Sequence, residues 1–238
     1  MSETITITIN GREIKAEPGT TILRAAQSAN IYIPTLCDNE ELTPYGSCRL
    51  CMVEITQKNR TRLVASCIYE VAEGLEVQTE TIRVANVRKL VIELLLTRNP
   101  YSATLKEIAS RVGVEKSRFK DDQKGCILCG QCVRVCREVV GVAAIGYKGR
   151  GFTKEVATPF DGPAIDCIAC GSCSYICPVD VIPMKEKDGI RTIWNTEFPM
   201  QTCKECGRQF APIKQLDYFK KNYNLPDNQF DTCIHCRK

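Results

Sequence analysis

The sequence predicts an α+β protein, and three observations support this expectation. The first third of the chain alternates apolar and polar residues with the period of β-strands. The stretch that follows has apolar residues at helical spacing, in residues 82–97 and again in 103–112. The remainder contains twelve of the sixteen cysteines, in groups with regular spacing. Metal sites are therefore expected to stabilise segments that are too short to bury a large apolar core.

The amino-terminal segment predicts a small sheet crossed by one helix. Strands are expected at residues 4–9, 12–16, 51–56, 62–67 and 75–81. Asn10-Gly11 suits a type I′ turn between the first two strands. Thr20 or Thr21 is placed to cap a helix that begins at Ile22. A hairpin, a helix and further strands in this order predict a β-grasp domain.

The first cysteine group falls inside this domain and consists of Cys37, Cys48, Cys51 and Cys67. Three ligands on one loop and a fourth far downstream are typical of a [2Fe–2S] site, although plant-type sites have four residues, not ten, in the first gap. Gly46 lacks a Cβ, so backbone amides near it can approach the cluster sulfurs. We expect a [2Fe–2S] cluster here, and buried structural cysteines are the alternative.

Two later runs have the spacing of [4Fe–4S] ligands: Cys126-x2-Cys129-x2-Cys132-x3-Cys136 and Cys167-x2-Cys170-x2-Cys173-x3-Cys177. In two-cluster sites of this kind, the fourth cysteine of each run ligates the other cluster. The expected ligand sets are Cys126, Cys129, Cys132 and Cys177 for one cluster, and Cys136, Cys167, Cys170 and Cys173 for the other. Zinc is the alternative, but zinc sites use two cysteine pairs instead of a triplet with a distant partner.

The glycine-rich segment between these two runs, residues 146–151, does not predict nucleotide binding. Its glycine spacing matches neither the Walker nor the dinucleotide fingerprint, and no helix signal follows it. We expect a hairpin turn there.

The last cysteine group has two pairs, Cys203-x2-Cys206 and Cys233-x2-Cys236. Paired knuckles of this kind make a tetrahedral zinc site, and Gly207 suits the tight turn after the first pair. Iron also accepts four thiolates, so a further iron–sulfur cluster is the alternative. His235 lies between two expected ligands and is not expected to be one.

Composition excludes several classes of function. The formal charge of +4 is small and the basic residues are dispersed, which argues against nucleic acid as a partner. Residues 1–4 do not begin a signal peptide, and no run of about 18 apolar residues predicts a membrane span. Many cysteines without a secretion signal favour a reducing, cytoplasmic setting with metal-bound thiolates.

The cysteine motifs, taken in order, resemble a known family over residues 1 to about 193. The chain resembles the small iron–sulfur subunit of the diaphorase part of NAD-linked hydrogenases, and the amino-terminal part of the large iron–sulfur subunit of respiratory complex I. Many members carry one more [4Fe–4S] cluster, held by one histidine and three cysteines after the linking helix. Residues 98–119 here contain neither residue type, so that cluster is expected to be absent.

The motifs and the resemblance together imply four parts: a β-grasp [2Fe–2S] domain (1–81), a helical linker (82–119), a ferredoxin-like domain with two [4Fe–4S] clusters (120–195) and a zinc-ribbon-like module (196–238). The resemblance implies an electron-relay subunit without catalysis of its own. The partners would be a flavin-containing NAD(P)-binding subunit, a second redox subunit and, in some branches, ferredoxin. A succinate dehydrogenase or fumarate reductase type of subunit and a free ferredoxin-like carrier remain the alternatives.

Overall fold

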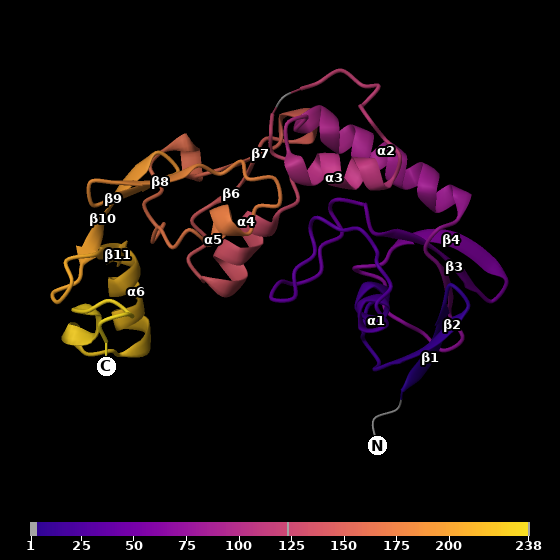
Figure 1. Ribbon diagram of the computed structural model, residues 1–238, viewed down its shortest axis with the longest axis horizontal. Helices are drawn as coiled ribbons and strands as arrows, with labels where there is room; N and C mark the ends of the chain where they lie inside the picture. Colours follow the sequence, from indigo (N-terminus) through magenta and orange to yellow (C-terminus); the bar gives the residue numbers. More distant parts are fainter. Residues whose placement is uncertain (1–3, 123, 238) are drawn as a thin grey trace. The chain divides into compact units, whose positions relative to one another are not determined.

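The computed structural model describes residues 4–122 and 124–237. The chain forms two compact units, residues 1–131 and 132–238 (Figure 1). Met1, Ser2 and Glu3, which the expectation about a signal peptide includes, lie outside the described residues. Within the described part of the chain, no helix is both long enough and apolar enough to cross a membrane.

The first unit contains a five-stranded sheet with the order β2-β1-β5-β3-β4. Its strands are β1 (Ile5–Ile9), β2 (Arg12–Ala16), β3 (Met52–Gln57), β4 (Arg60–Ala65) and β5 (Glu76–Gln78). β1 and β5 run parallel, whereas the other neighbouring strands run antiparallel. The predicted hairpin is confirmed, because Asn10 and Gly11 both have the positive φ angles, 50° and 79°, that a type I′ turn requires.

Helix α1 (Ile22–Ser28) packs its apolar side against this sheet. The hydroxyl of Thr21 accepts a hydrogen bond from the amide of Arg24, which identifies Thr21 as the cap. Ile7 and Ile9 lie in the shared core with Ile22 and Leu23, as the alternation in β1 predicts. Two cysteines of the first group, Cys51 and Cys67, belong to the same core. The apolar core therefore places part of the first cysteine group.

Two helices follow the sheet, α2 (Ile82–Arg98) and α3 (Ala103–Arg111), and they pack against each other. The hydroxyls of Thr81 and Ser102 cap them by accepting hydrogen bonds from the amides of Val84 and Leu105. Both predicted helices are confirmed to within one residue at each end. α2 also contacts β3, the strand that begins directly after Cys51.

The second unit is made of short elements around its cysteines. Helix α4 (Gln131–Arg134) begins just before the unit and continues as a π-helix (Val135–Val139), and α5 (Ser172–Tyr175) lies within the second cysteine run. β6 (Gly146–Lys148) and β7 (Glu155–Ala157) form a hairpin, which confirms the predicted turn. Short 3-10 helices occupy Gly151–Thr153, Pro159–Asp161 and Asp227–Phe230.

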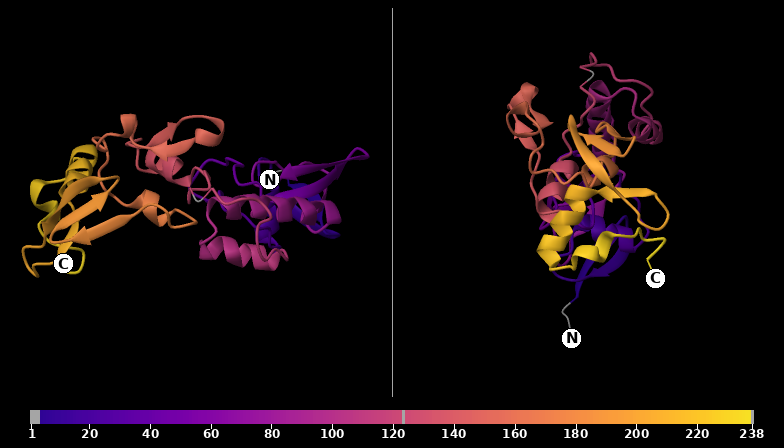
Figure 2. Two further views of the ribbon diagram at one scale, coloured as in Figure 1. Left: turned by 90° about the horizontal axis from the view of Figure 1, so that it is seen from above. Right: turned by 90° about the vertical axis from the view of Figure 1, so that its left-hand side faces the viewer.

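A four-stranded antiparallel sheet with the order β11-β10-β9-β8 crosses the predicted boundary at residue 195. Its strands are β8 (Met184–Lys187), β9 (Ile190–Ile193), β10 (Thr196–Thr202) and β11 (Gln209–Pro212). Helix α6 (Ile213–Tyr223) packs beside β10 and β11 (Figure 2). Phe198 of β10 is buried in one core cluster with Cys132, Cys167 and Cys173. The carboxy-terminal segment thus shares a sheet and a core with the residues before it.

Candidate metal centres

The four cysteines of the first group are all buried, with at most 4 % of each residue exposed. The thiol of Cys37 hydrogen-bonds with the thiols of Cys48 and Cys67, and the thiol of Cys51 hydrogen-bonds with that of Cys67. The amides of Cys48 and Leu36 donate to the sulfurs of Cys37 and Cys48, both at 3.4 Å. The structure therefore brings together all four residues that the sequence assigned to a [2Fe–2S] cluster.

The pKa values of these four thiols are shifted in opposite directions. Hydrogen bonds from Cys48 and Cys67 lower the pKa of Cys37, and the hydrogen bond from Cys67 lowers that of Cys51. Their partners respond oppositely, because donating these bonds raises the pKa of Cys48 and Cys67. Iron–sulfur clusters are held by thiolates, so loading this site has to release the protons that Cys48 and Cys67 retain.

The loop that carries these ligands is fixed by a turn and by an ion pair. Gly46 has a φ angle of 68°, and a Cβ there would lie 2.9 Å from Cδ1 of Ile68, so glycine suits both the backbone and the space. The amides of Ser47 and Cys48, directly after it, donate to the Cys37 sulfur. Arg24 of α1 pairs with Asp38 at 2.8 Å, which ties the segment after Cys37 to the helix.

A buried cation also lies close to this site. Arg88 of α2 is 8 % exposed, and its Nη2 donates a 2.8 Å hydrogen bond to the carbonyl oxygen of Met52. Burial lowers the pKa of Arg88, while the nearby Cys51 thiolate favours its charged form. The helical pattern does not predict this contact, since Arg88 lies among other polar residues of α2, including the adjacent Lys89.

The first cysteine run begins on a loop that is hydrogen-bonded to the first cysteine group. The hydroxyl of Ser47 donates to the carbonyl oxygen of Leu128 at 2.9 Å. The Nε2 of Gln131 donates to the carbonyl oxygen of Leu36 at 2.6 Å, and both residues are buried. Sequence reasoning missed Ser47 and Gln131 because a single polar residue beside a cysteine forms no recognisable motif.

The expected ligand set of the first cubane takes residues from both compact units. Cys126 and Cys129 lie in the unit of residues 1–131, and Cys132 and Cys177 lie in the other. Within the first unit, the amide of Leu128 donates to the Cys126 sulfur at 3.4 Å. Within the second, Cys132 belongs to the core cluster against which Cys177 packs. The grouping of these four residues stays a prediction.

The expected ligands of the second cubane, Cys136, Cys167, Cys170 and Cys173, all lie in the second unit. Burial raises the pKa of Cys136, Cys167 and Cys173, the last to about 11, and the neighbouring Cys170 adds an electrostatic contribution in the same direction to all three. Cys136 is thus a neighbour of the second run although it belongs to the first. Amides of Ala144 and Ala169 donate to the sulfurs of Cys136 and Cys167, at 3.2 and 3.3 Å.

One side chain also donates to a sulfur of this group. The indole Nε1 of Trp194 donates to the Cys173 sulfur at 3.4 Å. Trp194 is the only tryptophan of the chain and sits in the turn between β9 and β10. No motif predicts this contact, and only the fold brings the turn to the cysteine.

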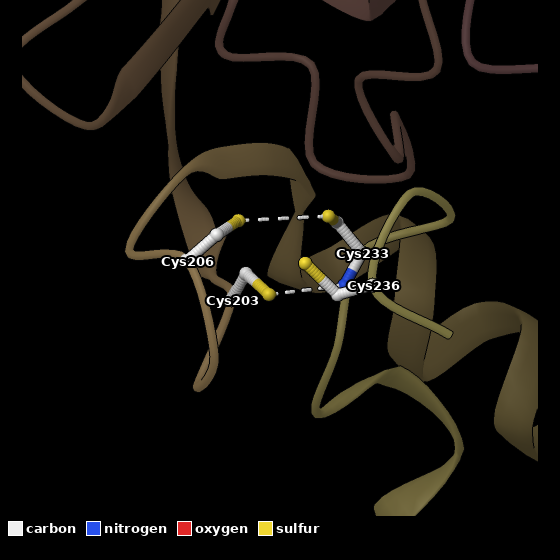
Figure 3. A group of neighbouring side chains, drawn as sticks. All are labelled: Cys203, Cys206, Cys233 and Cys236. Carbon is white, nitrogen blue, oxygen red and sulfur yellow. Dashed lines mark hydrogen bonds between the residues drawn. The ribbon is translucent and has the colours of Figure 1, made fainter. Parts of the chain in front are cut away.

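The carboxy-terminal cysteines form a compact four-sulfur group (Figure 3). The sulfurs of Cys203, Cys206, Cys233 and Cys236 all lie within 4.8 Å of one another. The sulfurs of Cys206 and Cys233 are 3.8 Å apart, which matches the roughly 3.8 Å that follows from tetrahedral geometry with Zn–S bonds of about 2.3 Å. His235 is exposed and lies outside the group.

Local backbone contacts shape both knuckles of this group. The amide of Cys233 donates to the Cys203 sulfur at 3.3 Å, and Gly207 turns the first knuckle with a φ angle of 69°. Amides of Cys206 and Cys233 lower the pKa of Cys203 to about 6, while the thiols of Cys206 and Cys233 raise that of Cys236 to about 12. Lys204 pairs with Asp231 at 2.6 Å and holds the two knuckles together.

Comparison with known proteins supports a [2Fe–2S] domain in the first third of the chain. A family model described as a 2Fe-2S iron-sulfur cluster binding domain matches residues 2–82. The chain is 31 % identical over 233 residues to one subunit of an NADH-quinone oxidoreductase of Rhizobium meliloti (strain 1021), covering 85 % of this chain and 27 % of that protein. It is 33 % identical over 210 residues to the HndD subunit of the NADP-reducing hydrogenase of Solidesulfovibrio fructosivorans, covering 75 % of this chain and 36 % of that protein.

A solved structure extends the likeness. One chain in a crystal structure of NAD+-reducing [NiFe]-hydrogenase in the H2-reduced state has 30 % identity and a TM-score of 0.66, covering 74 % of this chain and 85 % of that one. The chain spans about a quarter to a third of the length of the curated relatives named above. It belongs to the family of iron–sulfur subunits that NAD(P)-linked hydrogenases share with NADH-quinone oxidoreductases.

Proposed function

We propose that the chain is an electron-relay subunit of a multisubunit NAD(P)-linked oxidoreductase. The complex would be a hydrogenase, a formate dehydrogenase or an electron-bifurcating transhydrogenase. The chain passes electrons between a flavin subunit and another redox subunit, and we assign it no catalytic step. Its relatives support this proposal, since they are named as subunits of an NADH-quinone oxidoreductase and an NADP-reducing hydrogenase.

The observation that supports a relay most directly is the hydrogen-bonded join between two ligand loops. Ser47, next to Cys48, bonds to Leu128, which is next to Cys129. Gln131 bonds to Leu36, which is next to Cys37. When bound, the clusters would supply one-electron carriers. The two hydrogen bonds hold the ligand loops of the [2Fe–2S] site and the first cubane side by side within one compact unit.

We propose one [2Fe–2S] cluster and two [4Fe–4S] clusters as the resident cofactors. The [2Fe–2S] cluster is held by Cys37, Cys48, Cys51 and Cys67, whose mutual hydrogen bonds support the set. One cubane is held by Cys136, Cys167, Cys170 and Cys173, and the effect of the Cys170 charge on Cys136 supports it. The other is held by Cys126, Cys129, Cys132 and Cys177. This set follows from the reciprocal pattern of two-cluster sites.

We propose zinc at Cys203, Cys206, Cys233 and Cys236. Sulfurs within 4.8 Å of one another fit the shell of a single tetrahedral ion. A closed four-thiolate zinc site has no redox change and contributes folding energy. The alternative, a further iron–sulfur cluster, needs sulfurs far enough apart to enclose several irons, and the 3.8 Å separation of Cys206 and Cys233 does not favour it.

The domain arrangement belongs to the same proposal. A β-grasp domain covers residues 1–81, a helical linker 82–119, a ferredoxin-like domain with two cubanes 120–195, and a zinc-ribbon-like module 196–238. The sheet that continues from β9 into β10 supports close attachment of the last two parts. The sixteen cysteines form no disulfide, and all of them are metal ligands in this proposal, which favours a reducing cytoplasmic setting.

The partners follow from the family. We propose a flavin-containing NAD(P)-binding subunit, a second redox subunit and, in a bifurcating complex, ferredoxin. The ten residues between Cys37 and Cys48 argue against a succinate dehydrogenase or fumarate reductase type of subunit, which keeps the short plant-type gap. The appended knuckles argue against a free carrier, because a docked subunit has more use for such a module.

Copurification of the native complex under anaerobic conditions tests the proposal. We expect a flavin protein and a second redox protein to accompany the tagged chain, and NAD(P)H to reduce its clusters as seen by electron paramagnetic resonance. Cys48→Ser is the matched control, since it removes one [2Fe–2S] ligand and leaves both cubanes. A membrane anchor among the partners, no partner at all, or hydrogen or NAD turnover by the isolated chain would overturn the relay assignment.

A further inference from the structure

Trp194 occupies a backbone position that a bulky residue rarely adopts. Trp194 and Asn195 form the two-residue turn between β9 and β10, and their φ angles are 52° and 53°. Turns with two positive φ angles favour asparagine and glycine, and Asn195 fits this preference. A tryptophan in the left-handed region is an outlier that persists only where the surrounding structure determines it.

Thr196 is one of the residues that hold Trp194 in this conformation. Its hydroxyl donates to the carbonyl oxygen of Trp194 at 3.1 Å and accepts from the amide of Ala164 at 3.0 Å. Ala164 is buried in the core cluster that contains Cys167 and Cys173, and Trp194 packs against the same cluster. The turn is therefore held against the cysteine core from its backbone as well as from its indole ring.

The same hairpin contacts the second cysteine run twice. Nη1 of the buried Arg191 donates to the carbonyl oxygen of Ala169 at 2.7 Å, and the amide of Ala169 donates to the Cys167 sulfur. The indole N–H of Trp194 reaches the Cys173 sulfur directly, at 3.4 Å. Arg191 positions the loop, while Trp194 adds a side-chain donor to a sulfur that the cluster would use.

Hydrogen bonds to cluster sulfurs are one of the means by which a protein sets reduction potential. A donor stabilises the reduced cluster more than the oxidised one, because reduction adds negative charge at the metal and its sulfurs. The indole nitrogen can only donate, so its bond to a thiolate cannot reverse. Phenylalanine would keep an aromatic ring at this position without the donor.

We propose that Trp194 is a positioning residue that raises the reduction potential of the cubane held by Cys136, Cys167, Cys170 and Cys173. The inference rests on the proposed function, because it needs a cluster at these four cysteines. The inference goes beyond that function because it names a side chain that sets the reduction potential of this cubane relative to the other clusters. The strained turn is retained because it aims the indole N–H at Cys173.

A redox titration followed by electron paramagnetic resonance tests this, on the full chain with its clusters loaded anaerobically. Trp194→Phe should move the potential of one cubane to a more negative value and leave the [2Fe–2S] potential where it was. Met184→Leu is the matched control for repacking. Met184 also packs against the core cluster, and neither methionine nor leucine has a side-chain hydrogen-bond donor. It should leave all potentials unchanged.

Two further variants keep the test decisive. Cys173→Ser identifies the signal of the cubane in question by altering it selectively, and a wild-type chain with no such cubane would overturn the proposed function instead. If Trp194→Phe fails to load its clusters, Thr196→Val is used, because it releases the turn and keeps the ring. A negative shift in the same cubane supports the inference, and a loaded variant with the wild-type potential overturns it.

Discussion

The hydroxyl of Ser47 donates a hydrogen bond to the carbonyl oxygen of Leu128, 81 residues later in the chain. Each residue is the immediate neighbour of an expected ligand, Cys48 in one case and Cys129 in the other. A join at this place fixes two ligand loops to each other while leaving every cysteine available for its cluster.

We predict that removing either of the two hydrogen bonds between these loops lowers the free energy of unfolding, and that the two losses differ in size. Gln131→Leu leaves the buried carbonyl of Leu36 without this donor, so unfolding free energy should fall by about 1–3 kcal/mol. Ser47→Ala removes a partly buried bond and should cost about 1 kcal/mol or less. Thermal and denaturant unfolding of the loaded chain measure both. Ser47→Thr, which keeps the hydroxyl, is the control, and equal losses for Gln131→Leu and this control would contradict the interpretation.

Metal content distinguishes zinc from iron at the knuckles. A fully loaded chain should contain about ten iron atoms and one zinc, by the cluster assignment above. Elemental analysis after anaerobic reconstitution measures both metals. About fourteen iron atoms without zinc would mean that the carboxy-terminal cysteines hold a cubane.

Reciprocal ligation predicts crossed effects of two serine substitutions. Cys136→Ser should damage the cubane of the second run, because Cys136 lies beside Cys170 and Cys173. Cys177→Ser should damage the cubane of the first run. Each variant is compared with the other by electron paramagnetic resonance. Loss of the cubane that belongs to the substituted residue's own run would refute the pairing.

Removal of the knuckle ligands should affect structure more than electron flow. With Cys233 and Cys236 changed to serine, we expect faster proteolysis of residues 203–237 and weaker assembly, because so short a segment depends on its metal. The three proposed iron–sulfur signals and their reduction by the proposed flavin partner should persist. Electron transfer that stops in a fully assembled complex would identify the site as a redox centre.

Zinc affinity at the knuckles should fall as pH falls, and the slope should change near pH 6. Zinc binds thiolates, so binding releases whatever protons the cysteines retain. The backbone amides that lower the pKa of Cys203 to about 6 keep it ionised above that pH, and it contributes no proton there. Below about pH 6 it is protonated, so one more proton competes with each zinc. Competition titrations with a zinc chelator on both sides of this pKa measure the slope, and a constant slope would argue against a preformed Cys203 thiolate.

Local signals predicted the first unit well. The type I′ turn at Asn10-Gly11 and a helix cap at Thr20 or Thr21 depend on a few neighbouring residues. The structure contains the turn and identifies Thr21 as the cap. The cysteine spacing likewise named the residues that meet around two of the sites, because ligand geometry restricts how many residues separate them.

Long-range contacts could not be predicted in the same way. Arg88 lies in a helical segment with other charged residues, and nothing in that pattern predicts that it is buried and hydrogen-bonded to the carbonyl of Met52. In the sequence, Trp194 is only a residue next to asparagine. The hydrogen bond from its ring nitrogen to the Cys173 sulfur becomes visible only in the folded structure. The predicted boundary at residue 195 rests on cysteine grouping, which gives no information about the hairpin of β9 and β10 that continues the sheet past it.

Strand β10 belongs to two consecutive hairpins, one with β9 and one with β11. Residues 196–199 pair with β9, and residues 200–202 pair with β11. A shortened chain that ends before β11 would leave residues 200–202 with unpaired backbone groups beside an exposed sheet edge. Such edges recruit strands from other molecules and promote aggregation. A minimal fragment for crystallisation or for a synthetic electron circuit should therefore extend at least through Pro212, even where the carboxy-terminal metal is not wanted.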